Sequence, residues 1–592
     1  MIILMEGEMM EGAGDQGKLE IWQERLKRNE AAYSSELVKM ESREKIYGGS
    51  DLLTKLVPGD AAEYTRHVRN IASELIESQV NGNIPQPKVT PKRPADAAKA
   101  KLIEDLIRGE LDRLPMEVIN DMAERTVPIQ GGTVFLVEWD SSKHTHATSG
   151  EINITMLHPR QVIPQEGVYS GVQDMDYIIF KVVQTRENIS RKYGVKLKND
   201  DGIDDNSSFE SHGEDVIVQN IAYYRNETGG IGIFSWAGET ILEDMQDCQA
   251  QRKRQCSRCQ EAVPDRNVKQ CPKCGKGKLE EIILDSEEIM QLSSATVTVP
   301  VYNPSIFPVV TQKNVSVYGK FLGDSDIDKI KDQQNTANRI EQKIIDKLLK
   351  SGSYLVLPEQ ADIQVDAQDM KIIRPETPAA AGQIGVKDLQ GNISQDILYL
   401  EQVYQEARQI TGITESFQGR VDTTATSGRA KEFSAAQAAG RLESKNIMKN
   451  AAYAELFEIM FKFALAYMDE PRPVASQDSQ GNPEYKTFNR YDFLERDSTG
   501  ELYWNDGFQF SCDSTASLSG NREAMWQETR QNFESGTFGD PSQRETLILF
   551  WKKMEMLQYP GASETRANLE GRVMGQSEQL NLEQINLMQA MV

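Results

Sequence analysis

The sequence lacks any apolar run long enough to cross a membrane. A spanning helix needs about 20 consecutive apolar residues, and the nearest candidate, Ala451–Met468, is interrupted by Glu455, Glu458 and Lys462. The apolar stretch at residues 1–5 is too short for a secretory signal peptide. We therefore expect no membrane segment, a reducing cytoplasmic setting, and a buried core helix at 451–468.

Catalytic motifs are also missing. The chain has no P-loop and no GxGxxG motif, and the lone cluster Gly229–Gly232 is typical of a hairpin turn. None of its five histidines forms an HExxH pair, and His144 and His146 lie in a polar run that predicts a surface loop. The alternating acids from Asp324 to Asp328 lack the glycine and final glutamate of a calcium loop and suit a helix first turn. We predict that the protein is not an enzyme.

Positive charge is scarce. The 66 Lys and Arg residues face 90 Asp and Glu residues, for a net charge of −24 and a pI near 4.9. A protein that holds nucleic acid by neutralising phosphates needs a basic face, which this composition argues against. A negative surface would repel DNA and so suit a channel through which DNA slides. It would equally suit an ordinary soluble protein, and composition leaves both interpretations open.

Apolar periodicity predicts an α+β fold, in a chain long enough for three or four domains. Segments rich in β-branched and aromatic residues between 133 and 312 predict strands. Ser325 is a good N-cap for a helix to Lys350, and a second helix is expected at 393–410. A third runs from Arg429 to Met468, about 60 Å if fully helical. Helices of this length span a molecule or pack against copies of themselves.

Four of the six cysteines form two C-x-x-C knuckles separated by eleven residues. The candidate ligands are Cys256, Cys259, Cys271 and Cys274. This spacing predicts a zinc ribbon, in which four thiolates close a tetrahedral structural Zn²⁺ site with no open position for catalysis. Disulfides and a redox dithiol are the alternatives, disfavoured by a reducing compartment and by the absence of a surrounding βαβ pattern. Cys248 and Cys512 lack the spacing and are expected to be spare thiols.

Basic residues crowd around the knuckles, against only Glu261 and Asp265. They are Arg252, Lys253, Arg254, Arg258, Arg266, Lys269, Lys273, Lys276 and Lys278. A basic ribbon on an acidic protein could contact nucleic acid or an acidic partner, or be a solvated knob. We favour a solvated or protein-contacting ribbon over a nucleic-acid contact, because no aromatic residue is interleaved for base stacking.

Short motifs in chain order resemble the portal proteins of tailed bacteriophages. The residues that carry the resemblance are Glu74–Ile76, Ile84-Pro85, Glu124-Arg125, Val137–Asp140, Tyr318-Gly319, Gly323–Ile327, Asp332–Asn335, Thr411–Ile413 and Ser427–Ala430. Together they cover most of the chain. The zinc ribbon is an insertion that the general family does not require.

The resemblance implies a portal-like architecture of wing, stem, clip and crown. The implied parts are a wing at 1–323 with the inserted ribbon at about 250–280, a first stem helix at 324–351, a clip at 352–391, a second stem helix at 392–410, a tunnel loop at 411–427, a long wing and crown helix at 428–468, and a crown-like, mostly helical region at 469–592. The tunnel-loop residues expected to meet the DNA backbone transiently are Gln418, Arg420, Thr423, Thr424 and Thr426. The alternative is an ordinary connection between helices that never meets DNA.

The implied function is a ring, expected to be a dodecamer, at one capsid vertex of the virion, assembled in the host cytoplasm. The ring would admit DNA during packaging, release it on ejection and join head to tail. The implied partners are further copies of the chain, the major capsid protein, the terminase large subunit, a neck or adaptor protein, and double-stranded DNA. Two other classes stay open: a nucleic-acid-binding regulator that uses the zinc ribbon, and a zinc-stabilised hydrolase, for which no activated nucleophile is found.

Overall fold

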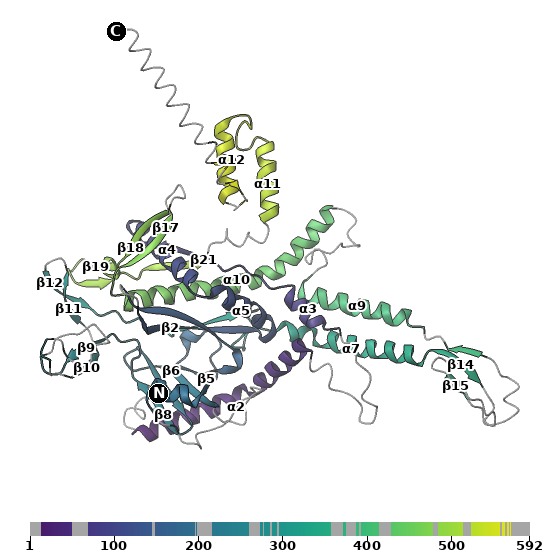
Figure 1. The fold of residues 1–592 in the computed structure, drawn as a ribbon, viewed down its shortest axis with the longest axis horizontal. Coiled ribbons are helices and arrows are strands. Elements are labelled where there is room, and N and C mark those ends of the chain that lie inside the picture. The colour runs from purple at the N-terminus through teal and green to yellow at the C-terminus, as the bar shows by residue number, and fades with distance from the viewer. Residues whose placement is uncertain are drawn as a thin grey trace, which may run out of the picture. The chain divides into compact units, whose positions relative to one another are not determined.

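The computed structural model describes residues 14–49, 69–144, 148–195, 197, 216–259, 271, 273–275, 278–283, 287–292, 295–356, 371–373, 386–389, 392–413, 428–477, 483–512, 522–556, 559, 561–562, 565–566 and 569. Its contacts divide the chain into two units. The larger comprises residues 1–82 and 87–511, and the smaller comprises 83–86 and 512–592. Figure 1 labels the elements of both.

A five-stranded antiparallel sheet lies against a long N-terminal helix in the larger unit (Figure 1). In spatial order its strands are β4 (Val162–Pro164), β5 (Tyr177–Thr185), β6 (Val216–Arg225), β7 (Ile231–Ala237) and β8 (Thr240–Met245). The short helix α6 (Arg186–Tyr193) follows β5 directly. All neighbouring pairs are antiparallel.

Helix α2 (Asp15–Gly48) connects this sheet to the rest of the unit. Near its start, Trp22 is fully buried against the rings of Tyr177 and Phe234 on the sheet. Further along, Met40 joins the apolar cluster that contains Val134 and Val309. Ile46 joins a separate apolar cluster that contains Ile327 and Val403. One continuous helix therefore contributes to three apolar clusters.

A second, three-stranded sheet carries the longest helix. Its order is β13 (Val309–Lys313), β2 (Gly132–His144) and β3 (Ser149–Leu157), and helices α5 (Met116–Gln130) and α10 (Gly428–Tyr467) pack against it. Helix α4 (Ala97–Arg113) contacts α10. Most apolar side chains of α10 from Ala452 onward are buried, including Leu456 and Phe457 with no exposed surface. This confirms the predicted core helix. Among the described residues, no helix combines the length and apolarity required to cross a bilayer.

Two antiparallel helices extend from the body and lead to a small sheet (Figure 1). They are α7 (Asp326–Lys350) and α9 (Ser394–Thr411), and α3 (Ile71–Glu77) packs at their base. Beyond them β14 (Gly352–Val356) pairs in parallel with β15 (Lys371–Ile373) and antiparallel with β16 (Val386–Leu389). Helices α7, α9 and α10 lie within two residues of their predicted bounds.

The region after α10 departs from the prediction of a mostly helical segment beginning at residue 469. Strands occupy most of 472–512, namely β17 (Arg472–Gln477), β18 (Pro483–Phe488), β19 (Leu494–Arg496), β20 (Leu502–Trp504) and β21 (Phe508–Cys512). Burial alternates along β17, where Val474 and Ser476 are buried and Pro473 and Ala475 are exposed, which is the period of a strand. The stretch at 81–94 contributes β1 (Pro87–Pro91), which pairs with β21.

The smaller unit contains two described helices, α11 (Arg522–Glu534) and α12 (Arg544–Met556). Aromatic side chains form much of its apolar cluster, and the rings of Phe533 and Phe550 lie 4.5 Å apart. Helices are therefore present as predicted at Arg522–Glu534 and Arg544–Met556.

Candidate metal centre and helical stem

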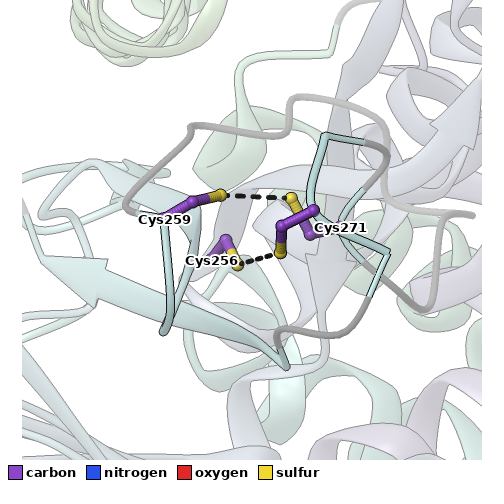
Figure 2. Close-up of side chains that lie close together, drawn as sticks. Cys256, Cys259 and Cys271 are labelled. Carbon is purple, nitrogen blue, oxygen red and sulfur yellow. Dashed lines mark hydrogen bonds between the residues drawn. The ribbon is translucent and has the colours of Figure 1, made fainter.

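The four clustered cysteines are brought together by a short hairpin. Strand β9 (Arg252–Cys256) pairs antiparallel with β10 (Leu279–Ile283), so that one knuckle follows the first strand and the other precedes the second. The four Sγ atoms all lie within 4.8 Å of one another. Two of the sulfur pairs, Cys256 with Cys274 and Cys259 with Cys271, are each separated by 3.5 Å. Figure 2 labels Cys256, Cys259 and Cys271 of this set.

These distances distinguish the alternatives left open by the spacing. A disulfide requires sulfurs about 2.05 Å apart, and all six cysteines are free. Four sulfurs placed about 2.3 Å from one tetrahedral ion would lie about 3.8 Å from each other, close to the separation observed. Cys256 and Cys271 are buried and the other two are partly exposed. The cysteines therefore form a set that can hold a metal ion with soft ligands.

The local backbone supports the same geometry. Gly275 has a φ of +64°, a conformation that suits glycine, and its N–H donates to the carbonyl of Cys271 at 2.9 Å. On the other knuckle the N–H of Arg258 donates to Sγ of Cys256 at 3.5 Å. Such N–H contacts stabilise negative sulfur and orient metal ligands. Four thiolates would leave a tetrahedral ion no open ligand position, which suits a folding role.

Side-chain hydrogen bonds from two glutamines and a tyrosine attach the ribbon to the body. The Nε2 of Gln251 donates to the carbonyl of Ala466 at 2.6 Å, and the hydroxyl of Tyr467 donates to the carbonyl of Gln249 at 3.1 Å. Gln249 in turn donates to the carbonyl of Ile306 at 2.6 Å. Between the ribbon and β13 lies a second hairpin, β11 (Glu287–Leu292) with β12 (Ala295–Pro300). The base of the ribbon is therefore held against the C-terminal end of α10.

The paired helices α7 and α9 form the second candidate site. Their shared seam buries Ile340 and Val403, and Asp396 accepts from Lys347 and lies 3.0 Å from Lys343. Large apolar side chains nevertheless stay exposed near the far end: Leu348 (51%), Ile397 (46%), Leu398 (66%) and Tyr399 (52%). We call these four residues the stem patch. Two helices alone cannot cover such side chains.

A buried ionic contact joins the start of α7 to α2. Arg43 has a side chain only 2% exposed, lies 2.7 Å from Glu36, and donates two hydrogen bonds to the carboxylate of Asp328. It also donates to the carbonyl of Gln130 at 3.2 Å. Sequence patterns did not single out Arg43. The available signal was its position three residues from both Met40 and Ile46, on the buried stripe of α2.

A second ionic contact lies near the end of α9. The ring of Tyr404 lies between the guanidinium groups of Arg69 and Arg408, each 4.1 Å from its centroid. Its hydroxyl donates to Glu74 on α3 and accepts from Arg408 at 2.8 Å. Three segments are therefore held together just before Gly412, where α9 ends.

Asp326 and Asp328 lie in the first turn of α7, as expected, whereas Asp324 precedes the N-cap Ser325. The acids of the first turn also bind cations. Lys445 of α10 pairs with the buried Asp326, whose other oxygen accepts from Asn314 at 3.1 Å. Arg43 binds Asp328 as described above. The predicted tunnel-loop residues Gln418, Arg420, Thr423, Thr424 and Thr426 lie outside the described residues.

Comparison with known families identifies the class of protein. A family model described as "Phage P22-like portal protein" matches residues 71–591, which is most of the chain. The chain belongs to this family of phage portal proteins. No curated protein matches the sequence significantly.

Proposed function

We propose that the chain forms the ring-shaped channel at one vertex of a phage capsid, through which DNA is packaged and later ejected, and which joins head to tail. Family membership over residues 71–591 is the observation that carries this proposal. The stem patch supports it, because exposed apolar side chains on paired helices would be buried between neighbouring copies in a ring. The excess of negative charge suits a channel that DNA must traverse without sticking.

The family assignment suggests a role for each part. We assign residues 1–323 to the wing, α7 and α9 to the stem, the β14–β16 sheet to the clip, 411–427 to the tunnel loop, α10 to the long wing and crown helix, and 469–592 to the crown. The expected partners are the major capsid protein, the terminase large subunit, a neck or adaptor protein and double-stranded DNA. The ring would be a dodecamer assembled in the host cytoplasm. Its role would be structural and needs no catalysis.

We assign the tunnel loop on its position between Gly412, which ends α9, and Gly428, which begins α10. Within it, Arg420 is the basic candidate for a transient contact with DNA phosphates. Replacing Arg420 with alanine should alter DNA packaging in an assembled capsid while leaving ring formation intact. Loss of the ring in this variant would instead indicate a role in helix packing.

We further propose that the four cysteines bind a structural Zn²⁺. The sulfur distances fit this ion, and the 29 residues from 252 to 280 contain too few apolar side chains to fold around a core of their own. We expect one tightly bound zinc per chain by elemental analysis, and none in a Cys256→Ser/Cys271→Ser variant. A native chain that binds no zinc would refute the assignment.

The ring is tested by the mass of the purified protein in solution, together with negative-stain imaging. We expect a large ring with a central hole from the native chain. Leu398→Glu should prevent assembly because it places a charge in the stem patch, whereas Val38→Glu, at a comparably exposed position on α2 (68%), should assemble normally. A compact monomer or dimer that binds DNA stoichiometrically through the ribbon would favour a nucleic-acid-binding regulator instead.

A further inference from the structure

The last turn of α10 is closed by side chains from two distant parts of the chain. The final backbone carbonyls of a helix have no partner within the helix itself. Here the carbonyl of Ala466 accepts from Nε2 of Gln251 at 2.6 Å and from the guanidinium of Arg490 at 2.7 Å. The buried Arg490 also donates to the carbonyl of Leu465 at 3.0 Å. The end of α10 is therefore capped jointly by a residue just before β9 and by a residue that follows α10.

The segment that precedes β9 is fixed at its base. The side-chain amide of Gln249 donates to the carbonyl of Ile306 at 2.6 Å and accepts from the N–H of the same residue at 3.3 Å, as a neighbouring strand would. Beside this pair, Asp247 accepts from Nδ2 of Asn303 at 2.7 Å. The chain before the metal site and the chain after it are thereby held together at one place.

The metal site lies directly beyond this base. Strand β9 begins at the residue after Gln251 and ends at Cys256, which is paired in register with Leu279 at the start of β10. The two strands share only five residue pairs, and an isolated two-stranded hairpin is marginally stable at best. Metal–sulfur bonds to both knuckles would hold the strands together, since the free energy of metal binding at such a site is folding free energy. Metal occupancy therefore determines how firmly Gln251 is positioned.

Arg490 carries the contact onward to a strand after α10. Its guanidinium lies 5.2 Å from the ring centroid of Trp504 on β20. Nε1 of Trp504 donates in turn to the carbonyl of Pro300 at 2.7 Å, and the hydroxyl of Tyr302 donates to Asp506 at 3.2 Å. The segment that follows the metal site therefore contacts β20, while the segment that precedes it contacts α10.

We propose that the four-cysteine site is a metal-dependent clasp for the C-terminal end of α10. With metal bound, β9 and β10 hold Gln251 on the carbonyl of Ala466. Without metal, this donor is released and Arg490 alone caps the helix. The inference rests on the proposed zinc site and assigns it a role beyond the folding of its own hairpin. Because α10 begins at Gly428, next to the assigned tunnel loop, the clasp anchors the end of the helix that is remote from that loop.

The test is hydrogen exchange in the full chain, with zinc bound and after its removal by EDTA under reducing conditions. The reporter is the amide of Met468, which donates to the carbonyl of Ala464 in the last turn of α10. Its exchange should become about tenfold faster when zinc is removed, because the helix end loses one of its two capping side chains. The Cys256→Ser/Cys271→Ser variant should exchange at the faster rate with or without added zinc.

Replacing Gln251 separates the clasp from a general loss of stability. In Gln251→Ala the amide of Met468 should exchange at the faster rate even with zinc bound, and removing zinc should then add little. The affinity for zinc, measured by competition with a chromophoric chelator, should fall by a similar factor, because the coupling between two sites is reciprocal. Gln23→Ala is the matched control, since Gln23 also donates to a distant carbonyl, that of Gly238, at 3.0 Å. It should change neither quantity.

Several outcomes would overturn the proposal. Faster exchange confined to β9 and β10 on zinc removal would leave the site as a local folding element. Faster exchange throughout the chain, including α11 and α12 in the smaller unit, would indicate general destabilisation. Zinc removal that accelerates Met468 equally in the native chain and in Gln251→Ala would show that Gln251 does not carry the coupling. A native chain without zinc would refute the proposed zinc site itself, and this inference with it.

Discussion

Replacing Arg43 is the most direct test of how the stem is attached to the body. The guanidinium binds Asp328 at the start of α7, Glu36 on its own helix and the carbonyl of Gln130 at the end of α5. Arg43→Met keeps an unbranched apolar stem of similar length and removes the charge and the donors. Three segments then lose their common partner.

The stability lost in Arg43→Met can be estimated from how far Arg43 and its two carboxylate partners are buried. Removing one member of a buried ion pair typically costs about 3–5 kcal/mol, because the remaining charge is left without a partner. Asp328 and Glu36 keep 34% and 21% side-chain exposure, so water can partly replace Arg43. We therefore expect the lower end, about 3 kcal/mol. At about 1.4 kcal/mol per factor of ten, this corresponds to roughly a 100-fold increase in local opening.

Hydrogen exchange measures this opening without requiring two-state unfolding of a chain with two units. Amides at the start of α7 and the end of α2 should exchange about 100-fold faster in Arg43→Met. Lys45→Met is the matched control, since Lys45 is 52% exposed and its ion pair with Glu41 lies within one helix, a contact worth about 0.3–0.5 kcal/mol. If both variants exchange at similar rates, the argument for a buried attachment is refuted.

Three further substitutions test other contacts. Ser325→Ala should cost about 1–2 kcal/mol in thermal or urea unfolding, because the hydroxyl caps α7 and also donates to a buried carbonyl at 2.6 Å; an unchanged stability would contradict the capping role. Gly131→Ala should destabilise by about 1–3 kcal/mol, since φ is +90° and the added Cβ would lie 2.4 Å from the carbonyl oxygen of Gly323; soluble expression and melting temperature check this. Burial alone would raise the pKa of Glu495, but hydrogen bonds from cationic and polar neighbours lower it to about 2. Its stabilising contribution is therefore complete above the unfolded-state pKa near 4.3 and is lost as pH falls toward 2. The difference in urea midpoint between Glu495→Gln and the native chain should therefore shrink as the pH falls from 5 to 3. A difference that stays constant over this range would refute the link between the ionisation of Glu495 and stability.

Local sequence signals were sufficient to locate several elements of the chain. The N-cap Ser325 and a regular apolar spacing located α7, and uninterrupted helical periodicity located α10. The two C-x-x-C knuckles identified the four cysteines that lie close enough together to hold a metal ion, because ligand spacing on tight turns is a property of neighbouring residues. The order of short motifs agreed with the portal family to which the chain belongs.

Other features depended on contacts between distant segments. Residues 472–512 were expected to continue a mostly helical region, yet they form short strands whose pairing, such as β21 with β1, joins residues more than 400 positions apart. Sheet propensity depends on such partners, so local composition was a poor guide there.

The role of Arg43 was likewise decided by tertiary structure, because its partner Asp328 is 285 residues away. A single sequence shows that a charge lies on an apolar stripe, but only the packing of α2 against α7 shows which carboxylate neutralises it. The chain itself therefore determined which segments form helices and which cysteines act together. The three-dimensional arrangement decided which charges are buried as pairs and which apolar side chains stay exposed.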